Sequence, residues 1–287
     1  MKKENSDSYF KDVIRKLSRH RLAMISFFVL VAEVLGILIL PEVLNLDPNV
    51  SNPGFYAAPD GKHLLGTDQV GRDVFARILS GGKVSLTVGL LASVISAFIG
   101  IPLGLIAGYY RGIWEMVIMR LTEVFQSIPS IVLILVIVSI TGPSTEVLIL
   151  TIGVLGWSGF TRLIYGSVLS VREKEYVESA RASGEKDYRI LIKYVLPNVV
   201  TPALIAFTFG IAGAILSESG LSFLGLGVQM PQASWGNILN SARNITVLSR
   251  YPWCWIPAGI ILIVTVSAIN FLGDGIRDAL DTNTNIL

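Results

Sequence analysis

The chain has 287 residues, of which 52% are hydrophobic and only 15% are charged, and its formal net charge is +2. Soluble domains carry about 25% charged residues, so this composition excludes a soluble globular protein and indicates that lipid surrounds most of the chain. The single cysteine excludes a disulfide within the chain, two distant histidines argue against a metal site built by this protein, and the net charge argues neither for nor against nucleic acid.

Six apolar stretches divide the sequence, each close to the roughly 20 residues that a membrane-spanning helix needs. They are residues 22–40, 84–107, 116–140, 147–169, 199–216 and 256–272. The residues before the first stretch include Lys2, Lys3, Lys11, Arg15, Lys16, Arg19 and Arg21. The positive-inside rule places this tail in the cytoplasm, and six crossings return the C-terminus to the same side. The sequence therefore predicts an all-α polytopic membrane protein with about six transmembrane helices.

The first apolar stretch has an alternative interpretation as a cleaved signal peptide. Its charged leader is long, and no small-residue cleavage pattern follows Leu40. Both features favour a membrane span that stays in the protein.

An external loop is predicted over residues 41–83, where prolines and glycines break the helical pattern. Val70, Val74 and Ile78 share one face of a predicted amphipathic helix along a surface over residues 64–79, with Thr67 or Asp68 as its N-cap. Residues 222–228 are apolar but too short to cross, which predicts a re-entrant segment or an interfacial hairpin. The tryptophans within residues 229–255 are typical of a membrane interface.

A polar island at residues 175–184 separates the fourth and fifth apolar stretches. From here to Lys193, acidic residues come first and basic residues follow. This order suits one or two short helices, because each helix end then carries side-chain charge opposite in sign to that end of the helix dipole. Gly184 stands where a helix C-terminus favours positive φ, and Asp187 is the predicted cap of a second helix. Leu191, Tyr194 and Val195 share a face of that helix. On charge alone, a merely solvated loop helix explains the island equally well.

The order of Glu178, Ser179, Ala180, Arg181, Gly184, Leu196 and Pro197 resembles the signature loop with which ABC importer permeases dock on an ATPase subunit. The sequence departs from that pattern at Ser179, where alanine is expected, and at Tyr194, where isoleucine is common. Three further segments resemble the C-type subunit of the dipeptide, oligopeptide and nickel permease family. They are residues 65–73, 221–227 with 234–236, and 271–281.

The resemblance implies a type I ABC importer, in which this chain and a sibling permease form a heterodimer in a prokaryotic cell membrane. Two ATPase subunits would bind ATP and Mg, and an external solute-binding protein would deliver the solute. This chain is expected to bind no cofactor or metal, to contact lipid but no nucleic acid, and not to be an enzyme. Arg77 stands where a phosphate-binding G-x-x-x-x-G-K loop needs its first glycine, so ATP hydrolysis is expected elsewhere.

The predicted organisation has three parts. Residues 1–83 hold the tail, the first span and the external loop; residues 84–274 form the permease core, with the coupling helix at 175–196; residues 275–287 form a cytoplasmic tail. The solute is predicted to be a di- or oligopeptide, with nickel or a metal chelate as the alternative. An ATP-independent channel or secondary transporter and a membrane scaffold or sensor are the alternatives from other classes.

Ionisable residues inside apolar stretches are candidates for function, since charge in a bilayer is costly. Glu218, with Ser217 and Ser219, is the candidate for the substrate path, because no partner within one helical turn is evident. Arg120 and Glu123 are predicted to form an ion pair. Arg162 is predicted to extend its side chain toward the cytoplasm, and Glu33 is predicted to face the sibling permease. Gly100, Gly104 and Gly108 lie four residues apart, which predicts that another helix packs closely against them.

Overall fold

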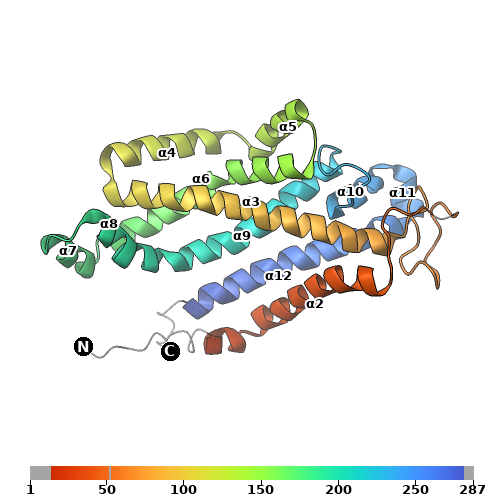
Figure 1. Ribbon diagram of the computed structural model, residues 1–287, viewed down its shortest axis with the longest axis horizontal. Helices are drawn as coiled ribbons and strands as arrows, with labels where there is room; N and C mark the ends of the chain where they lie inside the picture. Colours follow the sequence, from red (N-terminus) through yellow and green to blue (C-terminus); the bar gives the residue numbers. More distant parts are fainter. Residues whose placement is uncertain (1–13, 52, 281–287) are drawn as a thin grey trace.

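The computed structural model describes residues 14–51 and 53–280, and these form a helical bundle without strands (Figure 1). The all-α class is thus confirmed. The helices are α2 (Arg21–Val43), α3 (Val74–Tyr110), α4 (Gly112–Ser127), α5 (Ser130–Thr141), α6 (Thr145–Arg172), α7 (Glu175–Ala182), α8 (Asp187–Ile190), α9 (Leu196–Phe223), α10 (Trp235–Asn240), α11 (Ile245–Arg250) and α12 (Ile256–Leu280). A π-helical turn, Leu191–Val195, joins α8 to α9.

Five helical segments of the described chain are long and apolar enough to cross a membrane, and the number rises to six when α4 and α5 are counted together as one broken span. The predicted number of spans is confirmed, but continuity of the third span is wrong: α4 and α5 meet at a bend of 80°. Pro129 lies at the break, and Ile128 before it has extended backbone angles. A proline cannot donate a helical hydrogen bond and pushes its predecessor out of the helical region, so the break follows from the sequence.

The start of α3 differs from the prediction. Residues 64–73 form turns instead of an amphipathic surface helix, with Gly66 and Gly71 at φ +73° and +81°. The cap is neither Thr67 nor Asp68: the side chain of Asp73 accepts from the Ala76 N–H at 2.9 Å. Val74 and Ile78 are buried against α10 and α12. The apolar spacing was real, but it marks the first turns of a long helix packed inside the protein.

The helix α3 contains 37 residues. At 1.5 Å per residue it is about 55 Å long, whereas the hydrocarbon core of a bilayer is about 30 Å thick. Both ends of α3 therefore extend beyond the hydrocarbon and can carry polar contacts there.

The close contact between α3 and α6 rests on glycine. A Cβ atom at Gly100, Gly104 or Gly108 would lie 2.5, 2.7 or 2.7 Å from the Cβ atoms of Phe160, Ile164 and Val168. In lipid, where apolar side chains gain little by leaving the solvent, helices associate through this kind of backbone approach. The prediction for this glycine motif is confirmed, and the partner helix is α6.

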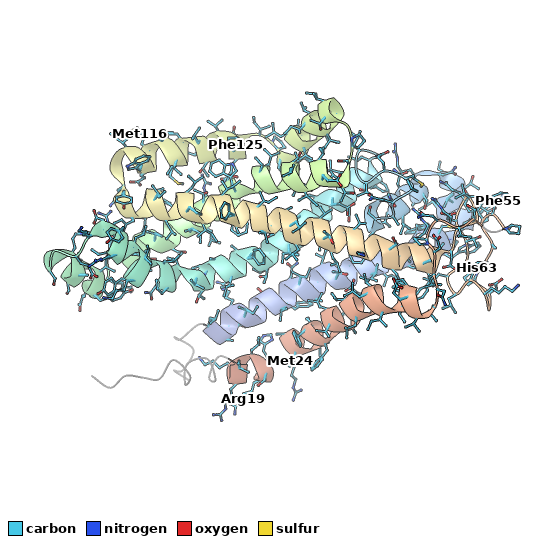
Figure 2. The ribbon with its side chains drawn as sticks, in the orientation of Figure 1. Arg19, Met24, Phe55, His63, Met116 and Phe125 are labelled. Atoms are coloured by element: carbon cyan, nitrogen blue, oxygen red, sulfur yellow. The ribbon has the colours of Figure 1, made fainter. Side chains whose placement is uncertain are left out.

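The two ends of the bundle have different neighbours. Helices α7 and α8 lie at the same end as the start of α2 and the end of α12, while the loop after α2, with α10 and α11, lies at the other end (Figure 1). Phe55 and His63 mark the second end (Figure 2). His20 Nε2 lies 3.4 Å from Asp278 Oδ2, so both described ends of the chain are on one side, as an even number of spans requires.

Two predicted tails reach beyond the described chain. Helix α12 continues to Leu280, so the boundary predicted after residue 274 falls within a helix. Residues 281–287 and residues 1–13, which include Lys2, Lys3 and Lys11, lie outside the described residues.

Replacing Gly104 by alanine should destabilise the bundle by about 1–3 kcal/mol, the usual cost of forcing a methyl group into a packed interior. The new Cβ would also lie 2.8 Å from the Thr161 carbonyl oxygen, which cannot rotate away. Gly166→Ala in α6 is the matched control, since no atom lies within 4 Å of its added Cβ. Thermal unfolding in detergent, followed by size-exclusion chromatography, measures both. Equal melting temperatures would show that α3 and α6 are not closely packed.

Candidate functional site

The segment from α7 to the start of α9 has one face on the bundle and one face in solvent. Val177 and Ala180 of α7 are buried against the ends of α3 and α6, in a cluster that includes Leu105, Ile164 and Val168. Glu178, Ser179 and Arg181 are exposed on the other side of the same helix. The structure therefore divides the predicted docking residues: Ala180 anchors the helix, and the side chains of Glu178, Ser179 and Arg181 are exposed.

Gly184 ends α7 in the way the sequence predicts. Its φ is +75°, its N–H donates to the Arg181 carbonyl at 3.0 Å, and the Glu185 N–H donates to the Ala180 carbonyl at 3.2 Å. These two bonds form a Schellman motif, which favours glycine because other residues are strained at positive φ. No atom lies within 4 Å of a Cβ at Gly184, so the backbone alone requires glycine here.

Asp187 does not cap α8, contrary to the prediction; the cap is Lys186, without a side-chain bond. Asp187 Oδ1 instead accepts from the hydroxyl of Tyr109 at 2.8 Å, which ties α8 to the end of α3. The guanidinium of Arg181 lies over the ring of the same tyrosine, 5.8 Å from its centroid. One aromatic side chain of α3 thus contacts both short helices.

The connection to α9 is also anchored. Ile190 and Val195 are fully buried, and Leu191 and Tyr194 pack on the same cluster, as their predicted shared face requires. Leu196 is half-buried, while Pro197 is exposed at the point where the π-helical turn passes into α9. The segment is therefore attached to α3, α6 and α9 together, so a force on its exposed face acts on all three helices.

Glu218 is fully buried in α9, and its carboxylate has partners in two helices. Oε2 accepts from the Ser85 hydroxyl of α3 at 2.8 Å, and Oε1 accepts from the Ser222 hydroxyl at 2.6 Å. Ser222 lies one helical turn further along α9, so the prediction that Glu218 lacks a partner within a turn is wrong. The pattern that reveals it is a glutamate followed four residues later by a serine.

The hydroxyls around Glu218 also hold the segments that follow α9, at the end of the bundle opposite α7. Ser85 Oγ accepts from the Trp235 N–H at 3.2 Å, and Ser222 Oγ accepts from the Val228 N–H at 3.0 Å. Residues 224–227 form a turn, so the predicted re-entrant segment is only the continuation of α9 to Phe223 followed by this turn. The carboxylate thus fixes the turn and α10 on the bundle.

The neighbours of Glu218 differ in exposure. Ser219 is buried, with its hydroxyl 3.4 Å from Glu218 Oε2. Ser217 is half-buried, donates to the Gly213 carbonyl of its own helix, and lines a cavity of about 200 Å³ between α3, α5, α6 and α9. Of the three candidate path residues, Ser217 alone lines this cavity.

The remaining predicted polar contacts have varied outcomes. Arg120 Nη1 lies 2.9 Å from Glu123 Oε2, which confirms the ion pair on the exposed face of α4. Arg162 is exposed on α6. Glu33 is half-buried and accepts from the Thr265 hydroxyl of α12, so at least one of its oxygens is engaged within the chain. In residues 14–51 and 53–280, no group of three or more His, Cys, Asp or Glu side chains is placed to hold a metal ion.

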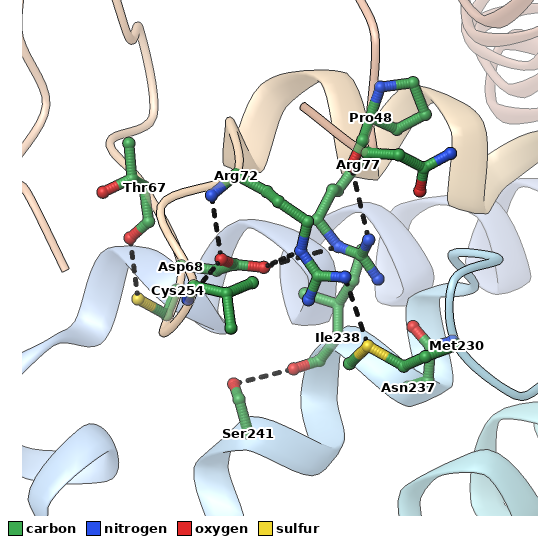
Figure 3. Close-up of polar contacts among 12 residues, drawn as sticks. Pro48, Thr67, Asp68, Arg72, Arg77, Met230, Asn237, Ile238, Ser241 and Cys254 are labelled. Atoms are coloured by element: carbon green, nitrogen blue, oxygen red, sulfur yellow. Dashed lines mark hydrogen bonds and ion pairs between the residues drawn. The ribbon is translucent and has the colours of Figure 1, made fainter. Parts of the chain in front are cut away.

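A polar pocket that no sequence pattern predicted lies at the end of the bundle opposite α7. Arg72, Arg77 and Asp68 lie together in it, and both arginines are buried (Figure 3). All three residues lie within residues 64–79, which the sequence predicted to form an exposed amphipathic helix, so no buried site was expected there. Arg77 within the apolar run from Val74 to Leu79 is the signal that could have revealed the site, because a charge there needs partners.

Comparison with known proteins decides the family. The model described as "Binding-protein-dependent transport system inner membrane component" matches residues 100–286, and that of the "N-terminal TM domain of oligopeptide transport permease C" matches residues 8–59. The chain belongs to this permease family. It is a multi-pass subunit of the ABC importer type, located in the bacterial inner membrane.

Relatives agree with this assignment, and a solved structure shares the fold. The permease is 37% identical to the dipeptide transport system permease protein DppC of Bacillus subtilis, over 97% of this chain and 87% of that one. It is 36% identical to DppC of Alkalihalophilus pseudofirmus, over 96% and 90%. A chain of the methionine ABC transporter MetNI, in an inward-facing conformation, shares the fold with a TM-score of 0.59 and 19% identity, over 71% of this permease and 97% of that chain.

Replacing Gly184 by valine should loosen the segment between α7 and α8, since a β-branched residue at φ +75° costs about 1–2 kcal/mol. Gly184→Asn should behave nearly as wild type, because asparagine tolerates this conformation. Trypsin cleavage after Lys186 in membranes measures the difference. Equal cleavage of all three proteins would contradict the backbone requirement.

Replacing Glu218 by alanine should destabilise the permease by about 2–5 kcal/mol, because two buried hydroxyls lose their acceptor. Ser217→Ala is the control, since its hydroxyl bonds only within its own helix turn. Thermal unfolding in detergent gives the comparison. If the Glu218→Ala variant has the melting temperature of the wild type but does not transport solute, Glu218 belongs instead to the solute path.

Proposed function

We propose that this permease subunit forms the translocation path of a di- or oligopeptide importer together with a sibling permease. The observation that carries the proposal is the two-faced α7: its apolar face is held by α3 and α6, and its polar face carries Glu178, Ser179 and Arg181 into solvent. A helix that is only solvated would not need the buried contacts of Val177 and Ala180, or the contacts of Tyr109 with Asp187 and Arg181. Such an anchored helix suits a protein partner.

Two ATPase subunits are the proposed partners of this face, with the α7 end of the bundle in the cytoplasm. ATP and Mg belong to those subunits, and the permease itself catalyses no reaction. An importer needs two conformations that external free energy favours in turn. Because the α7 segment is attached to α3, α6 and α9, nucleotide-driven movement of a docked ATPase would tilt these helices as a unit.

The solute is proposed to arrive from an external solute-binding protein at the opposite end, near α10 and α11. Peptides are the proposed solutes because relatives from two bacterial genera carry the name of dipeptide permeases over most of this chain. Uptake of a labelled dipeptide into cells, with competition by a nickel chelate, tests the choice. Loss of dipeptide uptake on deletion of this permease is expected; unchanged uptake would overturn the peptide assignment.

Replacing Glu178 by lysine should reduce co-purification of the ATPase subunits about tenfold, the equivalent of 1.4 kcal/mol, since the change reverses an exposed charge on the docking face. The folded permease should keep its melting temperature, because exposed substitutions cost within about 0.5 kcal/mol. Quantitative mass spectrometry of a tagged permease in mild detergent measures the subunits.

The matched control is Glu42→Lys, a charge reversal at another exposed glutamate, in the last turn of α2 at the opposite end of the bundle. It should leave ATPase recovery unchanged. Wild-type recovery with Glu178→Lys, or transport by the permease without any ATPase, would favour the channel or scaffold alternatives instead.

A further inference from the structure

The pocket at the external end lies between the loop after α2, the first turn of α3 and the segment around α10. Its volume is about 420 Å³, within the range of sites for small molecules. The charged residues that line it are Arg72, Arg77, Arg243 and Asp68, and three asparagines and a glutamine add amide groups. The lining is thus polar, partly enclosed and rich in guanidinium groups.

The positive charge of this pocket exceeds its negative charge. Asp68 is the single acidic residue among the lining residues, and it is already engaged: Oδ2 lies 2.8 Å from Arg72 Nε and 3.7 Å from Arg77 Nε, while Oδ1 accepts from the N–H groups of Val70 and Arg72. One carboxylate therefore serves two buried arginines. Buried charges are stabilised by charges of opposite sign, so the excess positive charge of the pocket favours the binding of an anion.

The outer nitrogens of both arginines have weak partners. Arg72 Nη1 donates to the thioether sulfur of Met230 at 3.2 Å, and Arg77 Nη1 donates to the Pro48 carbonyl at 3.4 Å (Figure 3). A thioether is a poor acceptor, and 3.4 Å is long for an N–H···O bond. Arg77 also lies in the first turn of α3, where the helix dipole already favours a negative charge.

The other ionisable groups of the lining add no negative charge. Burial raises the pKa of the Cys254 thiol to about 12, and the nearby Asp68 charge adds to this shift. Burial, first, and the nearby acidic groups raise the pKa of the Tyr56 phenol as well. Both side chains are therefore neutral at physiological pH, and the excess of guanidinium charge persists.

We propose that this pocket binds a carboxylate group at the external end of the permease, with Arg72 and Arg77 as its ligands and Arg243 at its mouth. Guanidinium groups match the planar carboxylate with paired hydrogen bonds, which a chloride ion cannot make. The carboxylate belongs either to a free solute or to an acidic side chain of a protein on the outer surface. The pocket lies at the end opposite α7, and its assignment to the external side rests on the proposed function, which places the α7 end in the cytoplasm.

The test uses the full-length permease in lipid nanodiscs, titrated calorimetrically in low-chloride buffer. The probes are glutarate and its uncharged diamide, glutaramide. Glutarate should bind saturably and glutaramide should not. Replacing Arg77 or Arg72 by glutamine should weaken glutarate binding about tenfold or more, the loss expected for a charge-assisted hydrogen bond.

Arg243→Glu keeps the test decisive if the buried arginines prove essential for folding, because Arg243 is exposed. It should weaken glutarate binding by roughly tenfold, since it replaces an attractive charge with a repulsive one. Arg250→Glu is the matched control: Arg250 is exposed on α11 but does not line the pocket, and its replacement should leave binding unchanged. Absence of saturable glutarate binding, or equal effects of the two substitutions, would overturn the proposal.

A second set of probes identifies the source of the carboxylate. Dialanine with a free C-terminus is compared with its amide and with a blocked tripeptide, acetyl-Ala-Glu-Ala-amide. Preference for free dialanine assigns the site to a solute carboxylate, and preference for the blocked peptide assigns it to an acidic side chain of a protein. Failure of both peptides to bind would contradict the proposal even if glutarate binds.

Discussion

The close packing of α3 against α6 is the interaction on which the rest of the structure depends. Lipid offers no hydrophobic gain when two apolar helices meet, so association has to come from backbone approach and dispersion contacts. Gly100, Gly104 and Gly108 supply that approach over three consecutive turns of α3. The result is a rigid pair whose ends reach beyond the hydrocarbon, and both candidate sites are built on those ends.

At one end, Tyr109 of α3 holds α7 and α8, and the last turns of α6 supply Val168 to the same cluster. At the other end, α10 packs on α3: the Trp235 indole N–H donates to the Ile78 carbonyl at 3.1 Å. The buried carboxylate of Glu218 adds α9 to this contact. Three hydroxyl groups, those of Ser85, Ser219 and Ser222, surround the Glu218 carboxyl group within the bundle.

The sequence predicted those features that depend on local physics. Apolar length gave the spans, glycine spacing gave the α3 contact, and the requirement for positive φ gave the end of α7 at Gly184. Errors arose where a long-range contact overrides a local pattern. Val74 and Ile78 have the spacing of a surface helix, yet they are buried by α10 and α12, which lie more than 150 residues away in the sequence. Ser85, the partner of Glu218, lies 133 residues before it in the sequence.

The length of α3 explains how one helix serves two polar sites. With about 55 Å of helix and about 30 Å of hydrocarbon, roughly 25 Å remains for the two interfaces together. Arg77 at the start and Tyr109 at the end therefore face polar surroundings, although both belong to a single apolar helix. One helix therefore joins the two polar sites, with Tyr109 at the α7 segment and Arg77 at the arginine pocket. Pro102 lies between them, and because a proline donates no helical hydrogen bond, the helix is weakest there.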